Sequence, residues 1–170
     1  MFDLRYNNRV KNFRKFYKSN KDRLFGYLLR MTGDYHLSAD LMQDSFTRYF
    51  ERYKDKDASV SLLFTIGRNL LFDNFREKDT HKSYEEGRHG LGRDQERAFL
   101  VREEYRRVLS AMQRLQKDER EMLTLAVSSD LSYREIAKIT GTSESNVKVK
   151  IHRSRLKLRK FLRAGEKYER

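Results

Sequence analysis

The residues best suited to binding another molecule lie in the last third of the chain, where a basic segment follows a helix-turn-helix pattern. From Lys148 to Arg163 there are eight Lys or Arg residues and no Asp or Glu. These side chains donate hydrogen bonds to phosphate oxygens, and Arg can also bond guanine through two parallel hydrogen bonds. The chemistry that they support is recognition of a nucleic acid.

The spacing of this segment divides it into two faces, at about 100° per residue of an α-helix. Val147 and Ile151 lie on one stripe and would attach the helix to its domain. The opposite face carries Lys148, Val149, His152 and Arg153. A solvated surface helix, whose charges only aid solubility, would explain such a face in isolation. The turn pattern that precedes it favours contact with DNA.

That turn pattern requires elements that present the basic helix. Ser132 and Glu135 have capping-box spacing, and Gly141 suits a left-handed residue at the end of the first helix. Ser143 can cap the second helix, which would then enter a major groove. The helix-turn-helix residues are predicted to be Tyr133, Ala137, Gly141, Val147 and Ile151.

Composition supports a polyanionic partner. The 170 residues carry a net charge of +13, with 38% hydrophobic and 37% charged residues, which favours small helical units with thin cores and counterion release from phosphates. A membrane surface would also attract this charge, but no stretch reaches the roughly 20 apolar residues of a transmembrane helix. Because the chain has no cysteine and no apolar leader, we expect a cytoplasmic protein.

An enzyme is the least favoured class. The four histidines show no metal-ligand spacing, and neither a nucleophile nor a carboxylate constellation is present. We therefore expect no catalytic residue, no metal and no cofactor.

Hydrophobic periodicity predicts an all-α protein with two small helical domains on a flexible linker. The first domain is expected over residues 1–80, the linker over 81–98, and a four-helix domain with the helix-turn-helix over 99–170. In the first domain, Ser38 is expected to cap the second helix. A third helix is expected from Leu62, after a polar break from Lys54 to Ser59. In the second domain, Asp118 and Glu121 have capping-box spacing.

Both halves together resemble the bacterial sigma factors of RNA polymerase, most closely the extracytoplasmic-function group. The segments that carry the resemblance are residues 24–34, 39–46 and 63–73, then 115–123 and the helix-turn-helix through Leu158. The resemblance implies that the chain binds the polymerase core, at the clamp helices of its largest subunit and at its flap, and reads promoter DNA. An anti-sigma protein is a further implied partner.

The resemblance also assigns roles to residues of the first domain. It implies that Asp40, Gln43 and Asp44 contact the clamp helices. It implies a grip on the unpaired minus-ten strand by Lys54, Lys56, Ser59, Ser61, Leu62, Arg68, Asn69 and Arg76. Leu62 stands where the family commonly has tryptophan, so a leucine wedge would replace an aromatic platform. A structural alternative for Arg68 and Asn69 is that they only stabilise helix packing.

In the second domain the resemblance implies that the basic face reads the minus-thirty-five element. Lys148, Val149, His152 and Arg153 would meet base edges and nearby phosphates, and Arg155 and Lys157 would contact the backbone. The competing function is a helix-turn-helix regulator of the response-regulator type, with the first domain as sensor or dimeriser. Such a regulator would bind repeated half-sites as a dimer.

Overall fold

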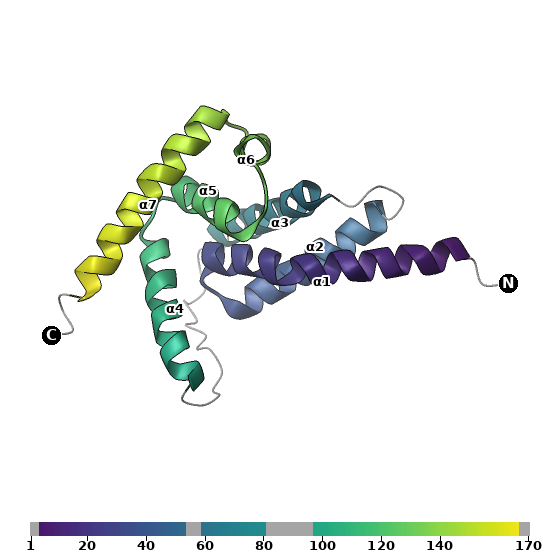
Figure 1. Cartoon of the computed structure of the whole chain (residues 1–170), viewed down its shortest axis with the longest axis horizontal. Coiled ribbons are helices and arrows are strands. Elements are labelled where there is room, and N and C mark those ends of the chain that lie inside the picture. The colour runs from purple at the N-terminus through teal and green to yellow at the C-terminus, as the bar shows by residue number, and fades with distance from the viewer. Residues whose placement is uncertain (1–3, 54–58, 81–96, 167–170) are drawn as a thin grey trace.

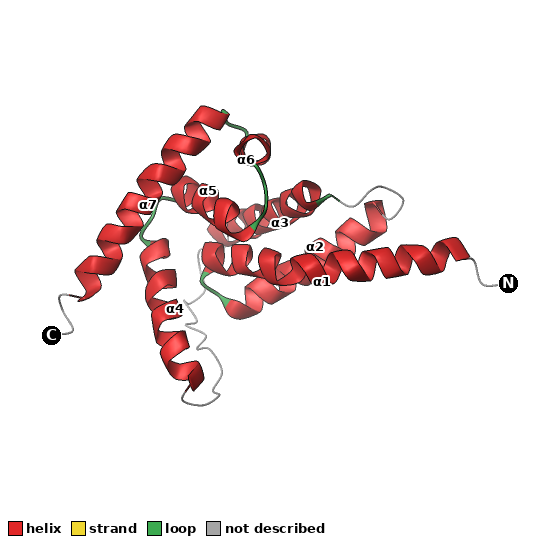
Figure 2. Ribbon diagram, in the orientation of Figure 1, coloured by secondary structure: helices red, strands yellow, loops and turns green. Residues whose placement is uncertain are grey.

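Helices account for all regular secondary structure in the described part of the chain. The computed structural model describes residues 4–53, 59–80 and 97–166, which form α1 (Leu4–Thr32), α2 (Tyr35–Tyr53), α3 (Val60–Thr80), α4 (Arg97–Gln113), α5 (Lys117–Ser128), α6 (Tyr133–Thr140) and α7 (Glu144–Glu166). Figure 2 shows short loops between α1 and α2 and between successive helices from α4 to α7. The predicted all-α class, with four helices in the second half, is confirmed.

The first half is a three-helix unit with an aromatic core. Phe64 of α3 and Tyr27 of α1 are fully buried, with ring centroids 5.6 Å apart. Gly67 lets the helices approach closely, since a Cβ added there would lie 2.9 Å from a methyl carbon of Leu24. The polar side of α3 is consequently held at a fixed angle to α1 and α2.

The second half packs directly on the first through α5. This helix lies between α1 and α7 (Figure 1) and contacts both of them. Its side chains Met122, Leu123 and Leu125 belong to one hydrophobic cluster with Leu24 and Leu28 of α1. The two halves therefore share a core, although each was expected to form a thin one of its own.

Helix boundaries agree with the local signals in most places. Gly33 has φ of 72° directly after α1, and Gly141 has φ of 68° after α6. The capping box of α6 forms as predicted, with the Ser132 side chain accepting from the Glu135 backbone and Glu135 reaching back to the Ser132 N–H. Ser143 caps α7, because its hydroxyl accepts from the Asn146 N–H at 3.2 Å.

Four boundary predictions were wrong. Asp34, rather than Ser38, caps α2 through the Leu37 N–H at 3.0 Å, and Ser38 is buried with its hydroxyl 2.8 Å from that of Thr32. The capping box of α5 is formed by Gln116 and Glu119, not by Asp118 and Glu121.

The third and fourth corrections concern the start of α3 and the end of the linker. The Ser59 hydroxyl accepts from the Leu62 N–H at 3.2 Å, and α3 begins at Val60, so Ser61 and Leu62 lie in its first turn. Residues 97 and 98, which the linker prediction included, belong to α4. The rest of that predicted linker, 81–96, lies outside the described residues.

The left-handed conformation of Gly141 generates a prediction. Gly141→Val should lower the free energy of unfolding by about 1–2 kcal/mol, because a β-branched residue is strained at positive φ. No atom lies within 4 Å of a Cβ added there, so strain alone is tested. Gly141→Asn is the matched control, since Asn tolerates this region. Equal losses for Val and Asn in urea unfolding would contradict the explanation.

Candidate nucleic-acid interface

The basic helix α7 is anchored by its inward face. Val147 and Ile151 are buried, as predicted. Lys157 Nζ lies 2.6 Å from the buried carboxylate of Glu119, and Lys150 pairs with Asp118, whose pKa is lowered chiefly by that hydrogen bond. Two of the eight basic side chains therefore attach α7 to α5, and Lys157, predicted to contact the DNA backbone, is one of them.

The outward face of α7 carries the predicted base-reading residues. Lys148, Val149, His152 and Arg153 are all exposed, and Lys148 forms an ion pair with Glu144 one turn earlier, at 3.0 Å. Arg155 is exposed at the flank. Among the described residues, none forms a hydrogen bond or an ion pair with Arg153. We call Lys148, Val149, His152 and Arg153 the α7 reading face.

The polar face of α3 is only partly exposed. Asn69 is exposed, and exposed Arg76 forms an ion pair with Asp73 at 3.1 Å. Arg68 instead turns to the second half, where its Nε lies 2.5 Å from Oε1 of Glu121. Its guanidinium also lies 4.6 Å from the Phe72 ring centroid.

The start of α3 holds the other residues predicted to meet the minus-ten strand. The Ser59 N–H donates to the Tyr49 hydroxyl at 2.7 Å, which fixes the chain entering the helix. Ser61 and Leu62 are half-buried, and Leu62 packs against the hydrophobic core. Lys54 and Lys56 lie outside the described residues.

A third surface lies on α2. Asp40, Gln43 and Asp44 are exposed, as their position opposite the apolar stripe predicted. Beside them a groove of about 370 Å³ runs between α1 and α2, lined by Phe13, Tyr17, Gln43, Phe46, Thr47, Phe50 and Glu51. Gln43 and the exposed carboxylate of Glu51 thus line an aromatic groove, an arrangement common where protein partners dock.

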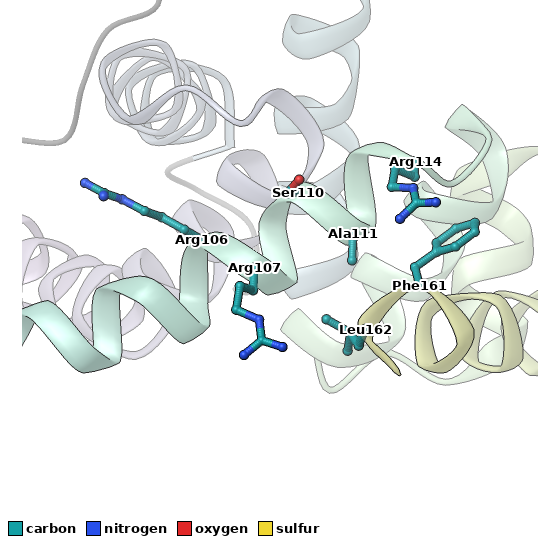
Figure 3. A pocket seen from close by; sticks show the side chains of 7 residues that line it. All are labelled: Arg106, Arg107, Ser110, Ala111, Arg114, Phe161 and Leu162. Atoms are coloured by element: carbon teal, nitrogen blue, oxygen red, sulfur yellow. The ribbon is translucent and has the colours of Figure 1, made fainter. Parts of the chain in front are cut away.

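A second groove, of about 340 Å³, lies between α4 and the end of α7. Its floor is Ala111, Phe161 and Leu162, and Arg107 and Arg114 border it (Figure 3). The guanidinium of Arg114 lies 4.3 Å from the Phe161 ring centroid, and the Arg106 side chain points away from that of Arg107 in the same view. The groove is basic and apolar.

Candidate metal clusters and candidate transmembrane helices are both missing from the described residues. They contain no cluster of three His, Cys, Asp or Glu side chains that could hold an ion. None of their helices combines the length and apolar character that crossing a bilayer requires.

The comparison with known families covers both halves. The family described as "Sigma-70 region 2" matches residues 16–80, and "Sigma-70, region 4" matches residues 105–158. The chain belongs to the sigma-70 family of RNA polymerase sigma factors. Members of this family are specificity subunits of the polymerase. Because both halves match sigma regions in order, the response-regulator alternative loses its support.

Individual sigma factors match along nearly the whole chain. The extracytoplasmic-function sigma factor SigM of Bacillus subtilis is 29% identical, and the match covers 88% of this chain and 94% of SigM. The sigma factor YlaC of the same organism is also 29% identical, with 91% and 94% covered.

Solved structures share the fold. RpoE of Bartonella quintana, in complex with the anti-sigma factor NepR, superposes with a TM-score of 0.71 at 21% identity, over 90% of this chain and 98% of that one. CnrH, in complex with the cytosolic domain of CnrY, gives a TM-score of 0.67 at 24% identity over 89% and 88%. The arrangement of helices in the sigma factor is thus one that solved members also adopt.

Two features of the sigma factor's surfaces were missed from sequence. Leu156 is 51% exposed and lies two turns after Val149 on the same side of α7. Its position between Arg155 and Lys157 could have indicated that it is exposed. Phe13 and Tyr17 of α1 line the groove beside Gln43. Only the packing of α1 on α2 brings them there, so no local pattern could indicate it.

The capping box that starts α6 generates a pH prediction. The pKa of Glu135 is lowered, first by the Ser132 hydroxyl and then by the Ser132 backbone N–H. A carboxyl with a lowered pKa in the folded state stabilises above its unfolded pKa and loses that effect as pH falls through the folded pKa.

Ser132→Ala should therefore reduce the free energy of unfolding by about 1 kcal/mol at neutral pH. The difference from wild type should shrink as pH falls through the lowered pKa of Glu135. Chemical unfolding at several pH values measures it, with Ser132→Thr as the control that keeps the hydroxyl. A difference of constant size down to the acid limit would exclude the capping box as its source.

Proposed function

We propose that the chain is a dissociable specificity subunit that brings RNA polymerase core to promoters, without an enzymatic activity of its own. Residues 1–80 would bind the core and the minus-ten element, residues 99–170 would read the minus-thirty-five element, and 81–98 would connect them. The observation that carries this is the exposed α7 reading face on a helix whose other face packs on α4, α5 and α6. Acting with polymerase, the chain would reside in the cytoplasm.

Reading of the minus-thirty-five element is assigned to the α7 reading face. Arg153 is the best single candidate for a base contact, because a guanidinium can bond O6 and N7 of guanine together. Val149 is 45% exposed, and an apolar side chain there suits a thymine methyl. Arg155 at the flank is placed for phosphate, and Lys157 could reach phosphate only by leaving Glu119.

Grip on the unpaired minus-ten strand is assigned to α3 and the segment before it. A protein without ATP opens a duplex only by binding the unstacked strand more tightly than the paired one. Asn69 and Arg76 offer exposed polar groups on α3. Lys54, Lys56, Ser59, Ser61 and Leu62 would complete this surface at the start of the helix, with Arg68 beside it.

Two grooves support docking to the polymerase. The acidic residues of α2 suit polar contacts at the rim of a clamp-helix interface, and the adjoining aromatic groove suits its apolar part. The groove between α4 and α7 lies on the buried stripe of α7, where Leu162 follows Ile151. A flap segment bound there would leave the α7 reading face exposed.

Regulation by an anti-sigma protein is part of the proposal. A solved sigma factor with this fold, RpoE, was captured in complex with the anti-sigma factor NepR. The grooves that suit polymerase would suit a competing protein as well, because occupying them blocks core binding without touching DNA-reading residues.

The proposed function predicts that the chain and core together initiate at specific promoters, whereas the chain alone binds promoter duplex poorly. Run-off transcription with reconstituted holoenzyme measures this. Asp44→Lys should weaken core binding about tenfold or more, because it reverses a charge at the docking rim. Asp22→Lys, at a carboxylate 87% exposed on α1, is the matched control. Identical transcripts from core with and without the chain would reject the function.

Base reading by Arg153 predicts a change of specificity. Arg153→Ala should cost about 1–3 kcal/mol on the cognate upstream element and relax the preference at one base position. Competition binding of holoenzyme to a set of single-base variants measures both effects. Arg159→Ala, further along α7, should weaken binding to all DNA sequences equally. The same uniform loss for Arg153→Ala would reassign Arg153 to phosphate.

A further inference from the structure

One residue of the helix proposed to bind the minus-ten strand, Arg68, is engaged by the protein itself. Arg68 Nε lies 2.5 Å from Oε1 of Glu121, and the two side chains are 24% and 5% exposed. Their residues are 53 positions apart and come from α3 and α5. A guanidinium binds a carboxylate and a phosphate with the same geometry. Glu121 therefore stands where a strand phosphate could stand.

The carboxylate of the pair is buried, so it requires a cationic partner. Tyr27, fully buried, lies beside it, and its pKa is raised well above the usual range by burial and then by the Glu121 carboxylate. Removing the guanidinium would leave a buried charge without compensation, which is strongly destabilising. The contact is thus a firm attachment of the second half to the first.

Further contacts join the two halves beside this ion pair, and we call this set of contacts the seam. Arg23 of α1 pairs with Asp130 at 2.7 Å, and Arg30 Nη1 donates to the Ser128 hydroxyl at 2.9 Å. Lys117 Nζ lies 4.2 Å from the Phe72 ring centroid. These contacts all join the first three helices to α5 or to residues at its ends.

The closed arrangement cannot read a promoter. Helix α6 of the helix-turn-helix contacts α3, so the two DNA-reading modules touch. The minus-ten and minus-thirty-five elements are about 25 base pairs apart, or about 85 Å at 3.4 Å per pair. Modules in contact cannot lie on both elements at once, and the seam has to open first.

We propose that Glu121 is an internal competitor of the promoter strand, which holds the chain closed by occupying Arg68 until polymerase separates the halves. This inference rests on the proposed function of α3. It adds a residue of the second half that limits DNA binding by the first.

The test combines a distance and an affinity. Glu121→Gln keeps the shape of the side chain and removes its charge, and Glu104→Gln, at an exposed position of α4, changes net charge equally. The chain has no cysteine, so cysteines introduced at exposed Ser19 and Ser145 take spin labels uniquely. Unlabelled protein without these cysteines is used to measure binding of a single-stranded minus-ten oligonucleotide at fixed salt.

Glu121→Gln should lengthen and broaden the distance between the labels and tighten strand binding about five- to tenfold. Glu104→Gln should do neither. Arg68→Ala added to Glu121→Gln should cancel the gain in affinity. Where Glu121→Gln destabilises the fold, Glu121→Met supplies a side chain of similar length that leaves no buried polar atom, and the same changes are expected.

Unchanged distances and affinities in both Glu121 variants would overturn the proposal. A longer distance between the labels without tighter strand binding would show that Glu121 holds the halves together. It would overturn the proposal that Glu121 competes with the strand for Arg68. Neither result depends on promoter-specific transcription by wild-type holoenzyme, so failure of the proposed function would be seen separately.

Discussion

The structure depends on the burial of α5 on two sides. This helix of 12 residues packs on α1 with one side and on α7 with the other. Its apolar residues complete a core that neither half, at this proportion of charged residues, would fill alone. Because the two attachments share one short helix, the orientation of the α7 reading face and the accessibility of α3 are set together.

The same helix carries two buried carboxylates, and each is paired with a cation of another helix. Glu119 and Glu121 are buried carboxylates of α5, and each is matched by a cation from a different partner, Lys157 of α7 and Arg68 of α3. Buried carboxylates require such partners, since an unpaired charge in a core is costly. These two carboxylates are thus neutralised inside the molecule, whereas Arg153 and Arg155 of α7 stay exposed where a polyanion can bind.

Local sequence patterns predicted what depends on a few neighbouring residues. The capping box of Ser132 and Glu135, the left-handed Gly141 and the two faces of α7 each follow from spacing within one or two turns. Ser38 failed as a cap because Asp34 lies one helical turn earlier and offers a carboxylate to the same helix start. Which of two nearby candidates caps a helix depends on the path of the backbone before that helix. The local capping pattern does not contain this information.

The partner of Arg68 could not be predicted, because it depends on a packing between halves that no local pattern encodes. A polar residue on an amphipathic helix signals an exposed face only while that helix is considered alone. Both interpretations of Arg68, helix packing and strand binding, then apply to different states of the chain. Arg68 stabilises packing in the closed chain, and opening would release it to bind the strand. A residue with one chemistry and two acceptors of the same geometry, a carboxylate and a phosphate, couples the fold to the ligand without any additional element.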